Sequence, residues 1–224
     1  MEHKANLEIE KTGEASKYTI IQEAIENDQP KEVIEILINL KADINEINED
    51  GQNSLHFLLK NEFFSYEKLE IFLKKKVNIN VVDYSNNFPL YYFLLNPLFD
   101  INSFKLLIEY KVDLKILNNT KRFNSLLLYC DNKKFDLENF KSLFLYDGDV
   151  NHQDSNGETV LHHAIKNSKI PISSIEYILN IKANVNTKSG SNFFILFYYF
   201  YYYFYFFIFY FLFFIFFYFF FIFY

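Results

Sequence analysis

Apolar residues recur along most of this chain with the spacing of an α-helix. Leu55, Leu58 and Leu59 stand at positions i, i+3 and i+4, and the segment 161–165 repeats that spacing. Because residues three and four apart share one face of a helix, each group predicts a helix with a buried face. Further apolar stripes along the chain predict helices at 33–40, 69–73, 104–108, 140–145 and 175–181.

The helical pattern returns at a fixed interval. Five similar short segments end at Asn45, Asn80, Lys115, Asn151 and Asn186, which gives a period of 35 or 36 residues. A leucine followed by His, Tyr or Leu comes about ten residues after the first four of these segments, at Leu55, Leu90, Leu126 and Leu161. Two independent marks with one period indicate tandem helix–turn–helix repeats, which bury their apolar faces against one another.

These marks divide the chain into three parts. A polar N-terminal segment, 1–17, precedes a repeat array at 18–192, and an apolar tail occupies 193–224. Within the array we predict units at about 18–47, 48–82, 83–117, 118–153 and 154–186, with a sixth unit begun at 187. The predicted fold class is all-α: a helix–turn–helix solenoid of about five repeats, followed by an apolar C-terminal helix or a disordered tail.

Two of the units carry a more specific motif. The fifth unit has Gly157, Thr159, Leu161-His162 and Ala164, and the second has Leu55-His56 after a turn. These segments resemble the ankyrin repeat, whose core motif is Thr-Pro-Leu-His-x-Ala. The resemblance implies that each histidine of the Leu-His pair ties the turn to the helix by hydrogen bonds. The motif residues are Leu55, His56, Pro89, Leu90, Gly157, Thr159, Leu161, His162 and Ala164.

The same resemblance implies a function. We expect a non-catalytic protein-binding scaffold or adaptor, monomeric apart from the tail, that binds another protein through the concave face of the repeat stack. The candidate partner-binding residues are Gln52, Phe57, Tyr84, Tyr92, Lys121, Arg122, Ser155, Glu158 and His163. The alternative for three aromatic and apolar positions, Phe57, Tyr92 and Leu128, is packing between neighbouring repeats.

Charge and motifs narrow the chemistry. A net charge of -6 argues against a nucleic-acid partner, because phosphate binding needs a concentrated basic surface. The single cysteine, Cys130, excludes an internal disulfide and is expected in the core. The chain lacks the HExxH, GxSxG, P-loop and dinucleotide-binding motifs, so we expect neither an enzyme nor a cofactor. No metal is expected either, since adjacent His162 and His163 point about 100° apart on a helix and make a poor pair, even with His152 nearby.

The tail leaves two interpretations open. Segment 193–224 contains nothing but Phe, Tyr, Ile and Leu, and a membrane-spanning helix needs about 20 apolar residues. One interpretation is a C-terminal anchor, which makes the protein a membrane-tethered scaffold that faces the cytosol and recruits a partner to a bilayer. The other is a gene-model artefact, since codons for these four residues are rich in thymine and the tail interrupts the sixth unit. Without the anchor, the expected localisation is cytoplasmic.

Overall fold

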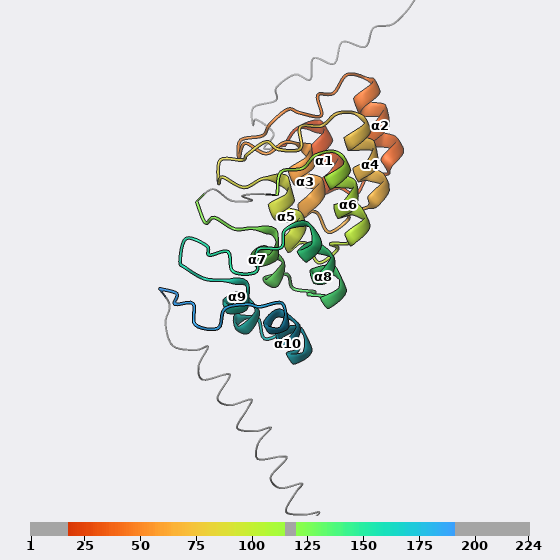
Figure 1. Ribbon diagram of the computed structural model, residues 1–224. Helices are drawn as coiled ribbons and strands as arrows, with labels where there is room; N and C mark the ends of the chain where they lie inside the picture. The colour runs from red at the N-terminus through yellow and green to blue at the C-terminus, as the bar shows by residue number, and fades with distance from the viewer. Residues whose placement is uncertain (1–17, 115–119, 191–224) are drawn as a thin grey trace, which may run out of the picture. The chain divides into compact units, whose positions relative to one another are not determined.

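The computed structural model describes residues 18–114 and 120–190, and these residues form ten α-helices and no strand (Figure 1). The helices are α1 Ile20–Glu26, α2 Lys31–Asn39, α3 Ser54–Lys60, α4 Tyr66–Lys74, α5 Pro89–Leu95, α6 Ile101–Glu109, α7 Ser125–Cys130, α8 Leu137–Tyr146, α9 Val160–Lys166 and α10 Ile172–Asn180. The predicted all-α class is confirmed, and each predicted second helix corresponds to an observed one. The connections 61–65 and 96–100 separate the two helices of their pairs.

Segments 1–17 and 193–224 lie outside the described residues, as do Lys115 and its neighbours to 119. The two interpretations of the tail therefore stay predictions. None of the helices in the described ranges has the length and apolar character needed to cross a bilayer.

The described residues divide into two compact units, with the boundary between Thr120 and Lys121. In the first unit, α3 contacts both α1 and α5, while α4 contacts both α2 and α6 (Figure 1). In the second unit, α7 contacts α8 and α9, and α9 contacts α10. Each unit is therefore built by repeating one helix pair, with the first helices of successive pairs packed together. The domain boundaries predicted from the repeat marks are finer than this division and stay predictions.

Short polar side chains begin most of the described helices, the exceptions being α2, α5 and α10. Asn53 accepts a hydrogen bond from the backbone N–H of His56, and Asn124 accepts one from Leu127. A side-chain oxygen at this position satisfies a backbone donor that the first turn leaves unpaired. The backbone N–H of Asn53 in turn donates to Nδ1 of His56. Likewise, the N–H of Thr159 donates to Nδ1 of His162. Each of the two histidines thus hydrogen-bonds to the residue that begins its own helix, and the wider role that the resemblance implies stays a prediction.

Leucines form part of the buried face of the first helix in most of these pairs. Leu55, Leu58, Leu59 and Leu161 are all buried, as their helical spacing predicts. Cys130 is a fully buried free thiol, as expected for a small core residue, and burial raises its pKa. Burying one such aliphatic side chain contributes about 1.5–3 kcal/mol, so these faces account for much of the stability of each unit.

Asparagines connect consecutive helix pairs at two levels. At the turns, backbone N–H groups one repeat away donate to the side-chain oxygens (Oδ1) of Asn45, Asn80 and Asn151 at 2.6, 2.9 and 2.7 Å. After the first helices, the amide of Asn96 donates to the backbone carbonyls of Leu59 and Asn61. The amide of Asn167 donates to the carbonyl of Cys130. Each of these bonds spans about one repeat, so the sequence period is also the period of the contacts.

Candidate functional site

The structure separates the predicted partner-binding residues into two groups. The exposed residues all lie in turns: Tyr84, Lys121, Arg122 and Ser155. Tyr92 is half-buried, and the buried residues are Gln52, Phe57, Glu158 and His163. Whether the exposed residues bind a partner stays a prediction.

Stacking of the helix pairs explains the buried group. The ring of Phe57 packs edge-on against Tyr18, and the Lys60 ammonium lies 4.1 Å from its centre. The side-chain nitrogen of Gln52 donates to Asp83 at the next turn and to the hydroxyl of Tyr92 on α5. For the aromatic and apolar positions, the alternative of packing between repeats agrees with this burial, and Leu128 is buried as well.

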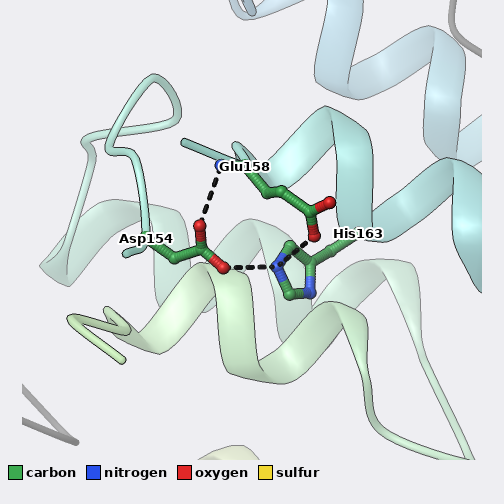
Figure 2. A group of neighbouring side chains, drawn as sticks. All are labelled: Asp154, Glu158 and His163. Atoms are coloured by element: carbon green, nitrogen blue, oxygen red, sulfur yellow. Dashed lines mark hydrogen bonds and ion pairs between the residues drawn. The ribbon is translucent and has the colours of Figure 1, made fainter. Parts of the chain in front are cut away.

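A group of ionisable side chains surrounds His163 in the second unit. His163 lies on α9, and Asp131 follows the last residue of α7. Asp154 and Glu158 come from the turn that leads into α9. Figure 2 shows the Asp154 and Glu158 carboxylates directed at the same ring nitrogen of His163. This cluster of Asp131, Asp154, Glu158 and His163 is the candidate site.

The two nitrogens of His163 have different surroundings. Nδ1 donates to Oδ1 of Asp131 at 2.9 Å. Nε2 lies 3.5 Å from Oδ2 of Asp154 and 3.8 Å from Oε2 of Glu158, and it has no hydrogen-bond partner although it is buried. An aromatic ring, that of Phe123, stands edge-on to the imidazole. His163 is thus held firmly at one nitrogen and aimed by the other between two carboxylates.

The remaining carboxylate oxygens are committed elsewhere. Oδ1 of Asp154 accepts the backbone N–H groups of Asn156 and Glu158 at 2.8 Å each, which fixes the turn. Oε1 of Glu158 accepts a hydrogen bond from the ammonium of Lys166, the last residue of α9. Each carboxylate therefore uses one oxygen to hold its place and directs the other at Nε2.

These surroundings affect the two neighbouring histidines in opposite ways. Burial lowers the pKa of His163, but the hydrogen bond to Asp131 and the charges of Asp131, Asp154 and Glu158 outweigh burial and leave that pKa raised. For His162, burial is the largest effect and leaves the pKa lowered. His163 is therefore the histidine whose environment favours a positive charge at its ring.

The first unit has a neutral counterpart of this arrangement. Tyr92 occupies the position of His163, and its hydroxyl donates to Oδ2 of Asp83 at 2.5 Å. Asp83, like Asp154, holds its turn by accepting two backbone N–H groups. Burial raises the pKa of Tyr92 to about 12, with the hydrogen bond to Asp83 adding to it. The fold thus pairs this helix position with the turn aspartate in more than one repeat.

Sequence reasoning found part of this cluster. It singled out Glu158 and His163 as partner-binding residues, but neither Asp131 nor Asp154 as a neighbour of His163. It also weighed a site with His152, whose ring Nε2 instead lies 2.6 Å from the backbone carbonyl of Arg122. Asp131 lies one repeat before His163, at a distance that no local spacing rule covers.

Comparison with known proteins adds a fold likeness. No protein-family model matches the chain, and no curated protein is similar to it in sequence. Among solved structures, the fold is similar to that of a chain in the structure of the Bd0816 predatory endopeptidase from Bdellovibrio bacteriovorus in complex with immunity protein Bd3460. The likeness covers 79% of this chain and 88% of that one at 18% identity, with a TM-score of 0.63. At this identity it shows the fold alone.

These findings correct the assignment to the ankyrin repeat family. No family model supports that assignment, and the similar solved structure is named as a peptidase and its immunity protein. A period of 35 or 36 residues lies within the range of about 20–45 residues found across repeat proteins, and helical leucine spacing is common to arrays of helix pairs, so neither feature singles out one family. The Leu-His motif is present in two units, and this is not enough to assign the chain to the ankyrin repeat family.

The functional expectations change with the family. A non-catalytic scaffold or adaptor, whether free or tethered to a membrane, was the wrong prediction, because the similar fold occurs in a peptidase complex. The expectation that the chain is not an enzyme is contradicted by the same finding, because the structurally similar complex contains an endopeptidase. Phe57 and His163, which were expected on a concave binding face, are buried. The expectation of a protein partner agrees with a fold found in a protein–protein complex.

Proposed function

We propose that this chain is one member of a protein pair whose other member is a peptidase, which it binds and controls. The observation that carries this proposal is the likeness over 79% of the chain to a structure solved as an endopeptidase in complex with its immunity protein. A fold does not fix a function, so the proposal also needs support from the chain's own surface.

The accessibility of the candidate site favours the immunity member of such a pair. The side chains of His163, Asp154 and Glu158 are 8%, 2% and 6% exposed. A peptide substrate would have to reach these atoms past the turn that Asp154 holds together. The exposed turns, in contrast, can contact a protein without any rearrangement.

Tyr84 is the best anchor among these turns. Its side chain is 72% exposed, yet its ring lies against the backbone of Gly51, so closely that a Cβ at Gly51 would stand 2.6 Å from the ring. The backbone N–H of Tyr84 also donates to the carbonyl of Asp50. An exposed aromatic ring that is already fixed loses little conformational entropy on binding, and tyrosine is enriched among residues that dominate binding energy.

The test mixes the purified full-length chain with purified peptidases of the organism that encodes it. The Bd0816 endopeptidase serves as a heterologous probe. We expect one of these peptidases to form a stable complex on gel filtration and to lose at least about tenfold of its activity in that complex. Tyr84→Ala should weaken the complex by at least about tenfold, or about 1.4 kcal/mol.

Tyr110→Ala is the matched control, because Tyr110 is also an exposed tyrosine of the first unit but lies at the end of α6. It should leave binding within about twofold of the original. If none of the peptidases binds, the proposed function is wrong. Binding that Tyr84→Ala leaves unchanged contradicts the choice of anchor.

A second candidate function is metal-dependent hydrolysis by the chain itself. It is favoured by one observation: Asp154, Glu158 and His163 each offer a ligand atom, and these atoms lie within 4.8 Å of one another. Three protein ligands with a water in the fourth position are typical of hydrolytic zinc centres. Peptide cleavage by the chain alone, lost in Glu158→Gln, would favour this function over the first.

A further inference from the structure

The buried Nε2 of His163 is a polar atom without a hydrogen-bond partner. The His163 side chain is 92% buried, and a buried polar group left unpaired costs about 1–3 kcal/mol. Two carboxylate oxygens face this nitrogen at distances longer than a hydrogen bond. An atom that binds all three would satisfy the nitrogen and neutralise the two acids.

We propose that Asp154, Glu158 and His163 bind one zinc ion, with Asp131 as the residue that positions the histidine. Binding uses Oδ2 of Asp154, Oε2 of Glu158 and Nε2 of His163. Peptidase binding needs no such ion, so this proposal stands or falls separately from that function, whereas the second candidate function, hydrolysis, rests on it.

The distances fit a tetrahedral ion. Zinc bonds of about 2.0–2.2 Å to nitrogen and oxygen place two ligand atoms about 3.4 Å apart at the tetrahedral angle. Nε2 lies 3.5 Å from the Asp154 oxygen and 3.8 Å from the Glu158 oxygen. Shifts of a few tenths of an ångström by the Glu158 side chain would complete the arrangement, and water would occupy the fourth position.

The supporting contacts prepare the ligands for a metal. Asp131 accepts a hydrogen bond from the Nδ1–H group of His163. In the neutral ring the lone pair therefore lies on Nε2. A carboxylate that holds a ligating histidine in this way is typical of protein zinc sites. Asp154 is fixed by two backbone N–H groups, so its free oxygen already points at the site. The arrangement therefore needs little reorganisation on binding.

The mixed donor set favours zinc over the other common divalent ions. Magnesium and calcium prefer oxygen ligands alone, and they bind six or more of them. One imidazole nitrogen with two carboxylate oxygens in a small, buried space suits a four-coordinate ion of the zinc type. Within residues 18–114 and 120–190, this is the group of acidic and histidine side chains that meets the ligand distances.

The positive charge of Lys166 disfavours binding of a metal ion at this site. Its ammonium binds the other oxygen of Glu158 and places a positive charge beside the site. Because like charges repel, removal of this ammonium should strengthen metal binding. Lys166→Met keeps the length of the side chain and removes the charge, which makes it a variant with an expected gain.

The experiment adds zinc to the full-length chain after chelation and gel filtration. We expect one equivalent to bind with a dissociation constant below about 10 μM and to raise the melting temperature. Cobalt(II) in place of zinc should give the intense visible absorption of a tetrahedral site. Lys166→Met should bind zinc several-fold more tightly.

His163→Tyr is the decisive variant, because the chain itself uses tyrosine at the matching position, Tyr92, opposite an aspartate. It should fold, as checked by circular dichroism, and bind zinc at least about tenfold more weakly. Asp131→Ala should weaken binding about 10–100-fold without removing a ligand. His152→Gln, which changes a nearby histidine outside the cluster, should retain full affinity.

Two outcomes would overturn the proposal. One is the absence of stoichiometric binding by the full-length chain at about 100 μM zinc, ten times the expected limit. The other is binding that His163→Tyr and Asp131→Ala leave unchanged while His152→Gln weakens it, since the ion would then lie elsewhere. If His163→Tyr fails to fold, cobalt absorption in Asp131→Ala and Lys166→Met decides between these results.

Discussion

At the scale of single residues, neighbours decide what each histidine can do. His56 and His163 lie one residue apart in the repeat pattern, and both are buried. His56 faces a backbone carbonyl, that of Asn87, and the ammonium of Lys60 lies close enough to disfavour a second charge. His163 faces three carboxylates instead. The same side chain is thus neutral in one repeat and favoured as a cation or metal ligand in another.

The neutral state of His56 predicts a loss of stability in mild acid. Burial lowers the pKa of His56 to about 4 from the usual 6.5. A histidine with a lowered pKa in the folded state takes up its proton more readily when the chain unfolds. Its contribution is therefore complete above pH 6.5 and is lost as the pH falls from about 6.5 to about 4, to a total of about 3 kcal/mol.

Urea unfolding of the full-length chain at a series of pH values between 7 and 4 would measure this loss. His56→Gln, which cannot titrate, should remove most of that slope, whatever its effect at pH 7. An equal slope in both proteins would show that His56 is not the titrating group.

Gly51 gives a second prediction at the residue scale. Its φ of +76° is a conformation that favours glycine, and a Cβ there would meet the ring of Tyr84. Gly51→Ala should therefore destabilise the protein by about 1–3 kcal/mol in thermal or urea unfolding. Gly190→Ala is the control, since its nearest neighbour for a Cβ is 3.6 Å away, and its effect should stay within about 0.5 kcal/mol. Equal effects of the two changes would contradict this account.

At the scale of elements, asparagine side chains form hydrogen bonds between consecutive helix pairs. Asn96 follows α5, and its side-chain amide donates hydrogen bonds to two backbone carbonyls at the end of α3. Asn167 does the same after α9 for the end of α7. Helix C-termini leave carbonyls without intrahelical partners, so one amide side chain here satisfies groups of a neighbouring helix. These bonds therefore fix the position of α5 along the axis of α3 and that of α9 along the axis of α7.

Asn96→Ala should consequently cost about 2–3 kcal/mol, because it leaves buried carbonyls of α3 without these donors. Asn27→Ala is the matched control: Asn27 is exposed and bonds within its own helix end, to the carbonyl of Glu23. Its cost should be below about 1 kcal/mol. Chemical denaturation of both variants would test the difference, and similar costs would argue against the joining role.

At the scale of the whole molecule, the repeated pairs make stability depend on position. In the first unit, α3 contacts α1, α4 and α5, whereas α1 contacts α2 and α3. Helices with neighbours on both sides open less often than those at an end. Amide hydrogen exchange should therefore be slower in α3 than in α1 by at least about tenfold, as measured by mass spectrometry on peptides. Equal protection of the two helices would show that the unit opens as one body.

The sequence predicted the second helices, because their apolar residues lie three and four positions apart, and it predicted the period, because similar short segments recur along the chain. It did not predict the surroundings of His163, since Asp131 belongs to the preceding repeat and meets His163 after the pairs have stacked. It also left open whether Phe57 binds a partner or packs between repeats, and stacking buries that ring against Tyr18. The inferred family failed for a related reason, as helix spacing is common to many arrays.

By itself, then, the sequence determined that the chain is helical and repetitive, because apolar spacing and capping residues act locally. The tertiary structure decided which side chains are exposed and which charges meet. It placed Asp131, Asp154 and Glu158 around one imidazole, and it left Tyr84 fixed at the surface of a turn. The physical reason is that burial and electrostatic contact between repeats arise when separate helix pairs pack, and no local pattern encodes that packing in full.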